Sequence, residues 1–190
     1  MKTNIKHIIK EMLLREEFDA GSAFNFIRQK EGRALPREYV LSVLKKGDIS
    51  KLSIPEDLGD DKELWQIYKF VHAPETLTKE DLHVEDLNLA GCTSLQSLPK
   101  GLSVDGNLNL NRCTSLRELP EGLSVGWYLF LEVCTSLREL PQGLSVGWYV
   151  YFNSTDPIPQ RFGVDKNAIR KYIREDLGGT VDNVIIYYEK

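Results

Sequence analysis

The spacing of apolar residues divides the chain into a helical first part and a repetitive second part. Apolar residues recur every three or four positions over residues 4–18, which predicts an amphipathic helix. A second helix is predicted after Ser22, and a third over residues 36–47. Acidic residues in the segment 60–63 open a fourth helix that is apolar on more than one side. We therefore expect residues 1–80 to form an N-terminal helical domain that caps the segment after it.

Residues 81–156 repeat a pattern with a period of 21 residues, which separates Cys92, Cys113 and Cys134. Each copy contains the phrase Leu-x-Leu-x-x-Cys-x-x-Leu. Side chains alternate along a strand, so the two leucines of Leu-x-Leu point inward and the residue between them points outward. A fixed period of this length predicts a solenoid, in which the short strands of successive copies form a parallel sheet.

The repeated phrase resembles the signature of the leucine-rich repeat family, which allows Asn or Cys at its sixth position. The three copies begin with Leu87-Asn88-Leu89, Leu108-Asn109-Leu110 and Leu129-Phe130-Leu131. The longer phrase Cys-Thr-Ser-Leu-x-x-Leu-Pro is also similar to repeats of bacterial leucine-rich repeat proteins and of plant resistance receptors. The resemblance covers roughly residues 82–155. For function it implies only a surface that binds partners.

The pattern decays in a fourth copy, where Thr155 stands at the position of the repeated cysteine. Asp165 is a suitable cap for a helix over residues 166–177, and residues 184–188 predict a last strand. Strand, helix and strand in this order favour a parallel crossover, so residues 157–190 should add a strand to the same sheet. The predicted fold class is α/β. It is a leucine-rich repeat solenoid with a parallel sheet, capped by an N-terminal helical region and a C-terminal helix-strand unit.

The outward positions of the predicted strands change from polar in the first two copies to aromatic in the last two. We expect a partner to bind across this face, at Asn109, Asn111, Tyr128, Phe130, Glu132, Tyr149, Tyr151 and Asn153. Aromatic residues on a solvated face are typical of binding hot spots. Two alternatives would remove this surface. The C-terminal segment could fold over it, or a strand register shifted by one residue would exchange inside and outside.

Two tryptophans, Trp127 and Trp148, precede the aromatic strands and share the parity of the core leucines. Because tryptophan buries a large area, we interpret this pair as stacked structural residues at the edge of the sheet. Direct contact with a ligand is the less favoured interpretation.

Charge and composition limit the class of partner. The net charge is −4, and residues 81–156 carry four basic and nine acidic side chains. An acidic face repels a phosphate backbone, so a nucleic-acid partner is not expected. The sequence has no apolar run of signal-peptide or membrane-span length. We therefore expect a cytoplasmic protein without membrane contact, unless a dedicated secretion system delivers it to a host cell as an effector.

No group of residues predicts catalysis, a cofactor or a metal site. His7, His72 and His83 are scattered and lack metal-ligand spacing. The three repeat cysteines occupy one equivalent position, so we expect reduced, buried thiols rather than a nucleophile. The sequence favours a non-enzymatic module that binds one protein partner on the concave sheet. Its role would be that of an effector, inhibitor or adaptor in a bacterial or phage setting.

Two further hypotheses stay open. The strand over residues 184–188 would leave a free sheet edge, through which two chains could pair into a structural or scaffolding homodimer. An enzyme whose residues lie within residues 1–80 is less favoured, because no motif supports it.

Overall fold

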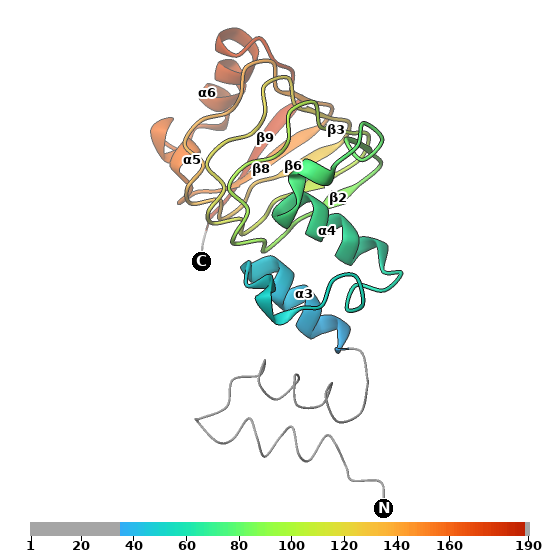
Figure 1. The fold of residues 1–190 in the computed structure, drawn as a ribbon. Helices are drawn as coiled ribbons and strands as arrows, with labels where there is room; N and C mark the ends of the chain where they lie inside the picture. The colour runs from blue at the N-terminus through green and yellow to red at the C-terminus, as the bar shows by residue number, and fades with distance from the viewer. Residues whose placement is uncertain (1–34, 189–190) are drawn as a thin grey trace, which may run out of the picture.

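The computed structural model describes residues 35–188, in which two helices pack against a coil of short parallel strands (Figure 1). The helices predicted over residues 4–18 and after Ser22 lie outside the described residues. The N-terminal elements are α3 (Arg37–Lys46), the 3₁₀ turn η1 (Ile49–Lys51), α4 (Lys62–His72) and the 3₁₀ turn η2 (Pro74–Thr76). The third and fourth predicted helices are therefore confirmed.

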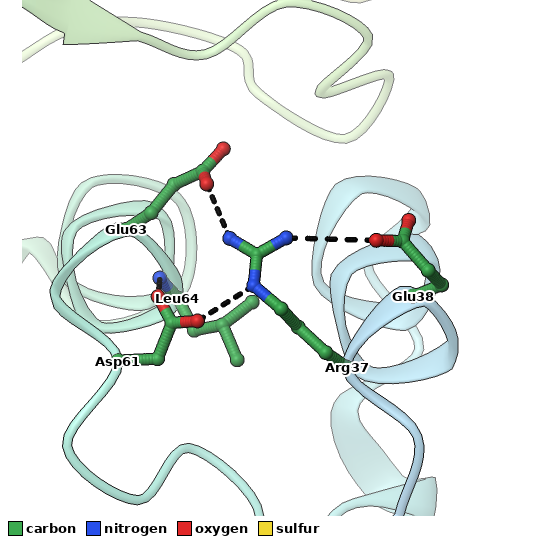
Figure 2. A network of polar contacts seen from close by, with 5 residues as sticks. All are labelled: Arg37, Glu38, Asp61, Glu63 and Leu64. Atoms are coloured by element: carbon green, nitrogen blue, oxygen red, sulfur yellow. Dashed lines mark hydrogen bonds and ion pairs between the residues drawn. The ribbon is translucent and has the colours of Figure 1, made fainter.

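Local signals fix the ends of these two helices. Gly47 has a φ of 93° and its N–H donates to the Val43 carbonyl, which ends α3. The Asp61 side chain accepts from the Leu64 N–H at 3.1 Å and so caps α4. Figure 2 shows Arg37 reaching across from α3 to Asp61, with 2.7 Å between Nε and Oδ2, and to Glu63. This pairing joins the start of α3 to the start of α4.

The strands at the Leu-x-Leu phrase of the three copies, the strand of the decayed fourth copy and the last strand form one parallel sheet. They are β2 (Leu87–Asn88), β4 (Leu108–Asn109), β6 (Tyr128–Phe130), β8 (Tyr149–Asn153) and β9 (Asn183–Tyr187), in the order β2-β4-β6-β8-β9. In the pairing register, equivalent residues of successive copies lie opposite each other, so that Leu108 pairs with Leu129. The predicted parallel sheet is confirmed, and so is the addition of the last strand to it.

A second parallel sheet was not predicted. Its strands have two residues each: β1 (His83–Val84), β3 (Ser103–Val104), β5 (Ser124–Val125) and β7 (Ser145–Val146). Such short strands show no alternation, so only the stacking of copies reveals them. The backbones lie very close here, because a Cβ added to Gly126 would lie 1.9 Å from the Asp105 carbonyl oxygen. Gly147 holds the same position one turn later, where an added Cβ would lie 1.9 Å from the Gly126 carbonyl oxygen, so these two turns need a glycine here.

The core runs through the middle of the coil and is formed by the repeated leucines. Leu89, Leu110 and Leu131 are fully buried. The predicted buried and reduced cysteines are confirmed, because all three are free and buried. The Cys113 Sγ donates to the Leu89 carbonyl at 3.1 Å, and the bond recurs one turn later. The thiols of Cys113 and Cys134 thus each bind a carbonyl of the preceding copy inside the coil.

The C-terminal segment returns to the sheet through three short helical turns: α5 (Pro157–Arg161), α6 (Lys166–Lys171) and the π-helical turn η3 (Tyr172–Asp176). The predicted helix over 166–177 corresponds to α6 and η3, and Asp165 caps it as expected by accepting from two backbone N–H groups. The helix α5 was not predicted, because its two prolines suggested an irregular segment. Pro157 lies in its first turn, where proline needs no hydrogen-bond donor.

Candidate functional site

Five aromatic side chains lie together on the outward face of β6, β8 and β9. We call Tyr128, Phe130, Tyr149, Tyr151 and Tyr187 the aromatic cluster. The alternate residues on β6 and β8, which are Leu129, Val150 and Phe152, are buried. The cluster members are half-buried or exposed, and Tyr187 has 49% of its surface exposed. The alternation of the strands therefore turns these rings away from the core.

The rings of the aromatic cluster stack on one another along the axis of the coil. Phe130 and Tyr151 have ring centroids 4.8 Å apart with planes 16° from parallel. The rings of Tyr151 and Tyr187 continue this stack, with centroids 5.9 Å apart and planes 12° from parallel. Tyr128 and Tyr149 form a second stack, with centroids 5.9 Å apart and planes 14° from parallel. Neighbouring rings therefore cover each other's faces. The ring edges and the tyrosine hydroxyls are left to meet a ligand.

The tryptophan pair extends this surface. Trp127 and Trp148 stack with centroids 6.1 Å apart, as the sequence suggested for an edge pair. They are nonetheless exposed over 49% and 47% of their surfaces, and Trp148 contacts Tyr128 edge-on at 5.3 Å. The pair therefore combines packing within the coil with an apolar area beside the aromatic cluster.

Asparagine occupies the same strand position in the first two copies and has a structural task there. Asn88 accepts a hydrogen bond from the Ala90 N–H at 3.1 Å, and Asn109 accepts from the Asn111 N–H at 3.1 Å. Each side chain thus satisfies the backbone donor where the chain turns out of the strand.

Aromatic rings replace this asparagine in the third and fourth copies and cannot accept that hydrogen bond. Other side chains take over the task. The Asn111 side-chain oxygen accepts from the Glu132 N–H at 2.8 Å, and the Asp156 carboxylate accepts from the Asn153 N–H at 2.7 Å. Asp156 is almost fully buried and also binds the Val133 N–H at 3.1 Å. The chain therefore holds the aromatic rings at these positions only with compensating polar groups.

A polar cavity of about 520 Å³ lies beside the aromatic cluster. It is lined by Ala90, Gly91, Asn109, Asn111, Arg112, Glu132, Val133 and Asn153. The four polar residues of the predicted site therefore meet in one cavity, while its four aromatic residues form most of the adjacent cluster. The Asn111 Nδ2 donates to the Glu132 Oε2 at 2.6 Å and so fixes the carboxylate between copies. Asn153 is only 8% exposed and bonds mainly to its own turn.

Burial raises the pKa of Tyr151 above its ordinary value, and the neighbouring tyrosines add to the effect. The Tyr151 hydroxyl is therefore a neutral hydrogen-bond donor at physiological pH. Together with the ring edges, it gives the face an amphipathic character that suits contacts with a protein surface.

The sequence interpretation missed two residues of this site. Tyr187 was predicted to lie in the last strand, and strand alternation alone would have placed it on the aromatic face. Arg112 was not considered, because nothing in the repeat pattern indicates that it lines a cavity. It adopts a φ of 62° in the turn after its strand, as Val133 does one copy later.

The described histidines have structural partners. His72 Nε2 lies 2.6 Å from the Leu44 carbonyl, and His83 lies 3.2 Å from Asp105. His7 lies outside the described residues. Within residues 35–188, no group of three or more His, Cys, Asp or Glu side chains could hold a metal ion, and no helix is long and apolar enough to cross a membrane.

Comparisons of the chain with protein families, with curated proteins and with solved structures found no match. The fold alone therefore defines the class, which is a parallel-strand solenoid of about three turns with helices at both ends.

Proposed function

We propose that this protein is a non-enzymatic interaction module of the leucine-rich repeat type, which binds a protein partner on the aromatic cluster. The repeat spacing and the buried Leu-x-Leu phrase support the assignment to leucine-rich repeats. The observation that carries the binding role is the replacement of a structural asparagine by aromatic rings. These rings are left partly open to solvent, although each replacement needs a compensating hydrogen bond.

The geometry of the rings favours a protein over other ligands. Sugars and nucleic-acid bases bind aromatic residues by stacking on their faces. In the cluster most ring faces are covered by neighbouring rings, whose centroids lie 4.8–5.9 Å apart. Edges and hydroxyls suit the mixed apolar and polar contacts of a protein interface. The acidic charge of the repeat segment also argues against nucleic acid.

We assign the module the role of an effector, inhibitor or adaptor in a bacterial or phage setting. It would act in the cytoplasm, or in a host cell after delivery by a secretion system. A surface that captures one partner, without chemistry of its own, serves all three roles.

The chain's own repeats supply the variant that tests this proposal. Phe130→Asn with Tyr151→Asn places at both positions the residue found in the first two copies. The variant keeps an acceptor for the turn and removes two rings of the cluster. Peptides from a random library displayed on phage are selected on the wild-type protein. Tyr188→Asn, which removes an exposed tyrosine outside the cluster, is the matched control.

We expect the enriched peptides to lose binding to the double variant by at least about tenfold, because hot-spot aromatic residues dominate interface energies. Binding to Tyr188→Asn should match the wild type. The proposal is wrong if no peptide is enriched, or if the enriched peptides bind the double variant as tightly as the wild type.

Self-association through β9 is a second candidate, favoured by the position of this strand at the end of its sheet. The Asn183 N–H and the Tyr187 carbonyl bond toward β8, so the backbone groups of Ile186 point away from it. Such an edge can pair with a second copy. Sedimentation should then show a dimer that Ile186→Pro converts to monomer, because proline removes an edge donor. A wild-type monomer at high micromolar concentration would exclude this candidate.

A further inference from the structure

Phe130 ends its stack on the side of the second copy. Its ring pairs face to face with Tyr151, but in the other direction its strand neighbour is Asn109. Asn109 carries an amide and uses its side-chain oxygen for the Asn111 N–H. Among the described residues, no aromatic ring stacks on this second face of Phe130. The Phe130 side chain as a whole is half-buried, and Asn109, its neighbour on this side, lines the polar cavity.

A fixed carboxylate stands two residues further along the same face of the sheet. Glu132 lines the polar cavity, and its Oε2 accepts from the Asn111 Nδ2 at 2.6 Å. Its other oxygen, Oε1, has no hydrogen-bond partner or ion pair within the described part of the chain. The carboxylate is therefore oriented in advance and keeps one oxygen for a ligand.

Glu132 supplies the negative charge of this face that a cationic ligand can use. On the outward strand positions the charged residues are Asp86 and Glu132, and none is lysine or arginine. Arg112 lines the rim of the same cavity but forms no ion pair with Glu132 in the described structure. The cavity thus contains a carboxylate acceptor, and the Phe130 ring lies next to it on the same face of the sheet, two residues before Glu132.

We propose that this corner, formed by Phe130, Glu132 and Asn109, binds an arginine side chain of the protein partner. A planar guanidinium can stack on the Phe130 face while its N–H groups donate to the Glu132 Oε1. Lysine carries the charge without the plane, so it should fit less well. This inference rests on the proposed function, because it names the residue through which the partner is recognised.

The test uses three small compounds and NMR on the full chain. N-acetyl-arginine amide is the ligand analogue. N-acetyl-lysine amide keeps the charge without the plane, and N-acetyl-citrulline amide keeps the plane without the charge. Titration of the ¹⁵N-labelled protein follows the backbone amides of Asn109, Phe130 and Glu132. The variant Glu132→Gln keeps an oxygen for Asn111, and Asp86→Asn, immediately before β2, is the matched control.

We expect the arginine compound to shift these amides and to bind at least about fivefold more tightly than the lysine and citrulline compounds. Glu132→Gln should weaken the binding of the arginine compound by at least about fivefold, whereas Asp86→Asn should leave this binding unchanged. Arg112→Gln, which removes a competing cation, should bind it more tightly than the wild type.

Absence of shifts at these amides would overturn the inference. It would also be overturned if the citrulline compound bound as tightly as the arginine compound, or if Glu132→Gln bound the arginine compound as tightly as the wild type does. The proposed function would survive that result if library peptides still required the rings of Phe130 and Tyr151. It would fail separately if the peptides ignored the aromatic cluster.

Discussion

Raising the pH from about 8 to about 10 should destabilise the protein through its buried thiols. Burial raises the pKa of Cys92 to about 12 and that of Cys113 to about 11. An unfolded-chain thiol has an ordinary pKa near 9, so it releases its proton across this interval while the folded thiol keeps it. A raised folded-state pKa means that stability present below pH 9 is lost as the pH rises. For one fully buried thiol the loss at pH 10 is about 1.5 kcal/mol.

The measurement compares urea unfolding of the wild type and of Cys113→Ala at both pH values, under reducing conditions. Cys113→Ala removes one thiol and lowers stability at both pH values by creating a small cavity. That cost cancels when the change with pH is compared. Tyrosine and lysine titrations are common to both proteins and cancel as well. We expect the wild type to lose about 1.5 kcal/mol more than the variant between the two pH values.

Equal losses in the two proteins would refute the reasoning. That result would mean that Cys113 ionises as easily in the folded chain as in the unfolded chain. The description of Cys113 as fully buried, with its thiol bonded to the Leu89 carbonyl at 3.1 Å, would then be contradicted.

Two further predictions concern the coil and its N-terminal cap. Gly126→Ala should destabilise the fold by roughly 3 kcal/mol or more, because the added Cβ would lie 1.9 Å from the Asp105 carbonyl oxygen; an unchanged thermal midpoint would contradict this close approach. The Lys69 side chain, and the Thr78 N–H, lower the pKa of Asp81 to about 2, so its stabilisation should be lost as the pH falls from about 4 to about 2. Asp81→Asn should therefore cost about 1 kcal/mol at pH 7, a figure reduced because the carboxylate is 25% exposed, and only a small part of this at pH 2, where half of the folded carboxylate is protonated; a constant difference would count against the ion pair.

The parts of the fold that repeat could be predicted from the sequence. Three copies in phase identify the leucines that point inward, and Leu89, Leu110 and Leu131 are fully buried as expected. The last strand was predicted because its apolar run and the helix before it fit one crossover. These elements depend on local pattern, which a single sequence carries.

The features that the sequence did not predict depend on contacts between copies. The Ser-Val strands of the second sheet have two residues each, too few for a recognisable period. Asn111 accepts from the Glu132 N–H of the next copy, and Asp156 accepts from the Val133 N–H of the preceding copy as well as from the Asn153 N–H of its own turn. The face carrying Tyr128 and Phe130 followed from alternation, but the polar cavity beside it required the stacked turns.

The most direct test of the proposed binding face is chemical-shift mapping with a peptide selected on the wild-type protein. The account predicts that amide shifts concentrate on β6, β8 and β9, around Phe130, Tyr151 and Tyr187. An outer groove lined by residues that include Leu98, Leu119 and Leu140 is the alternative surface. Shifts confined to that groove, with the aromatic strands unchanged, would contradict the account.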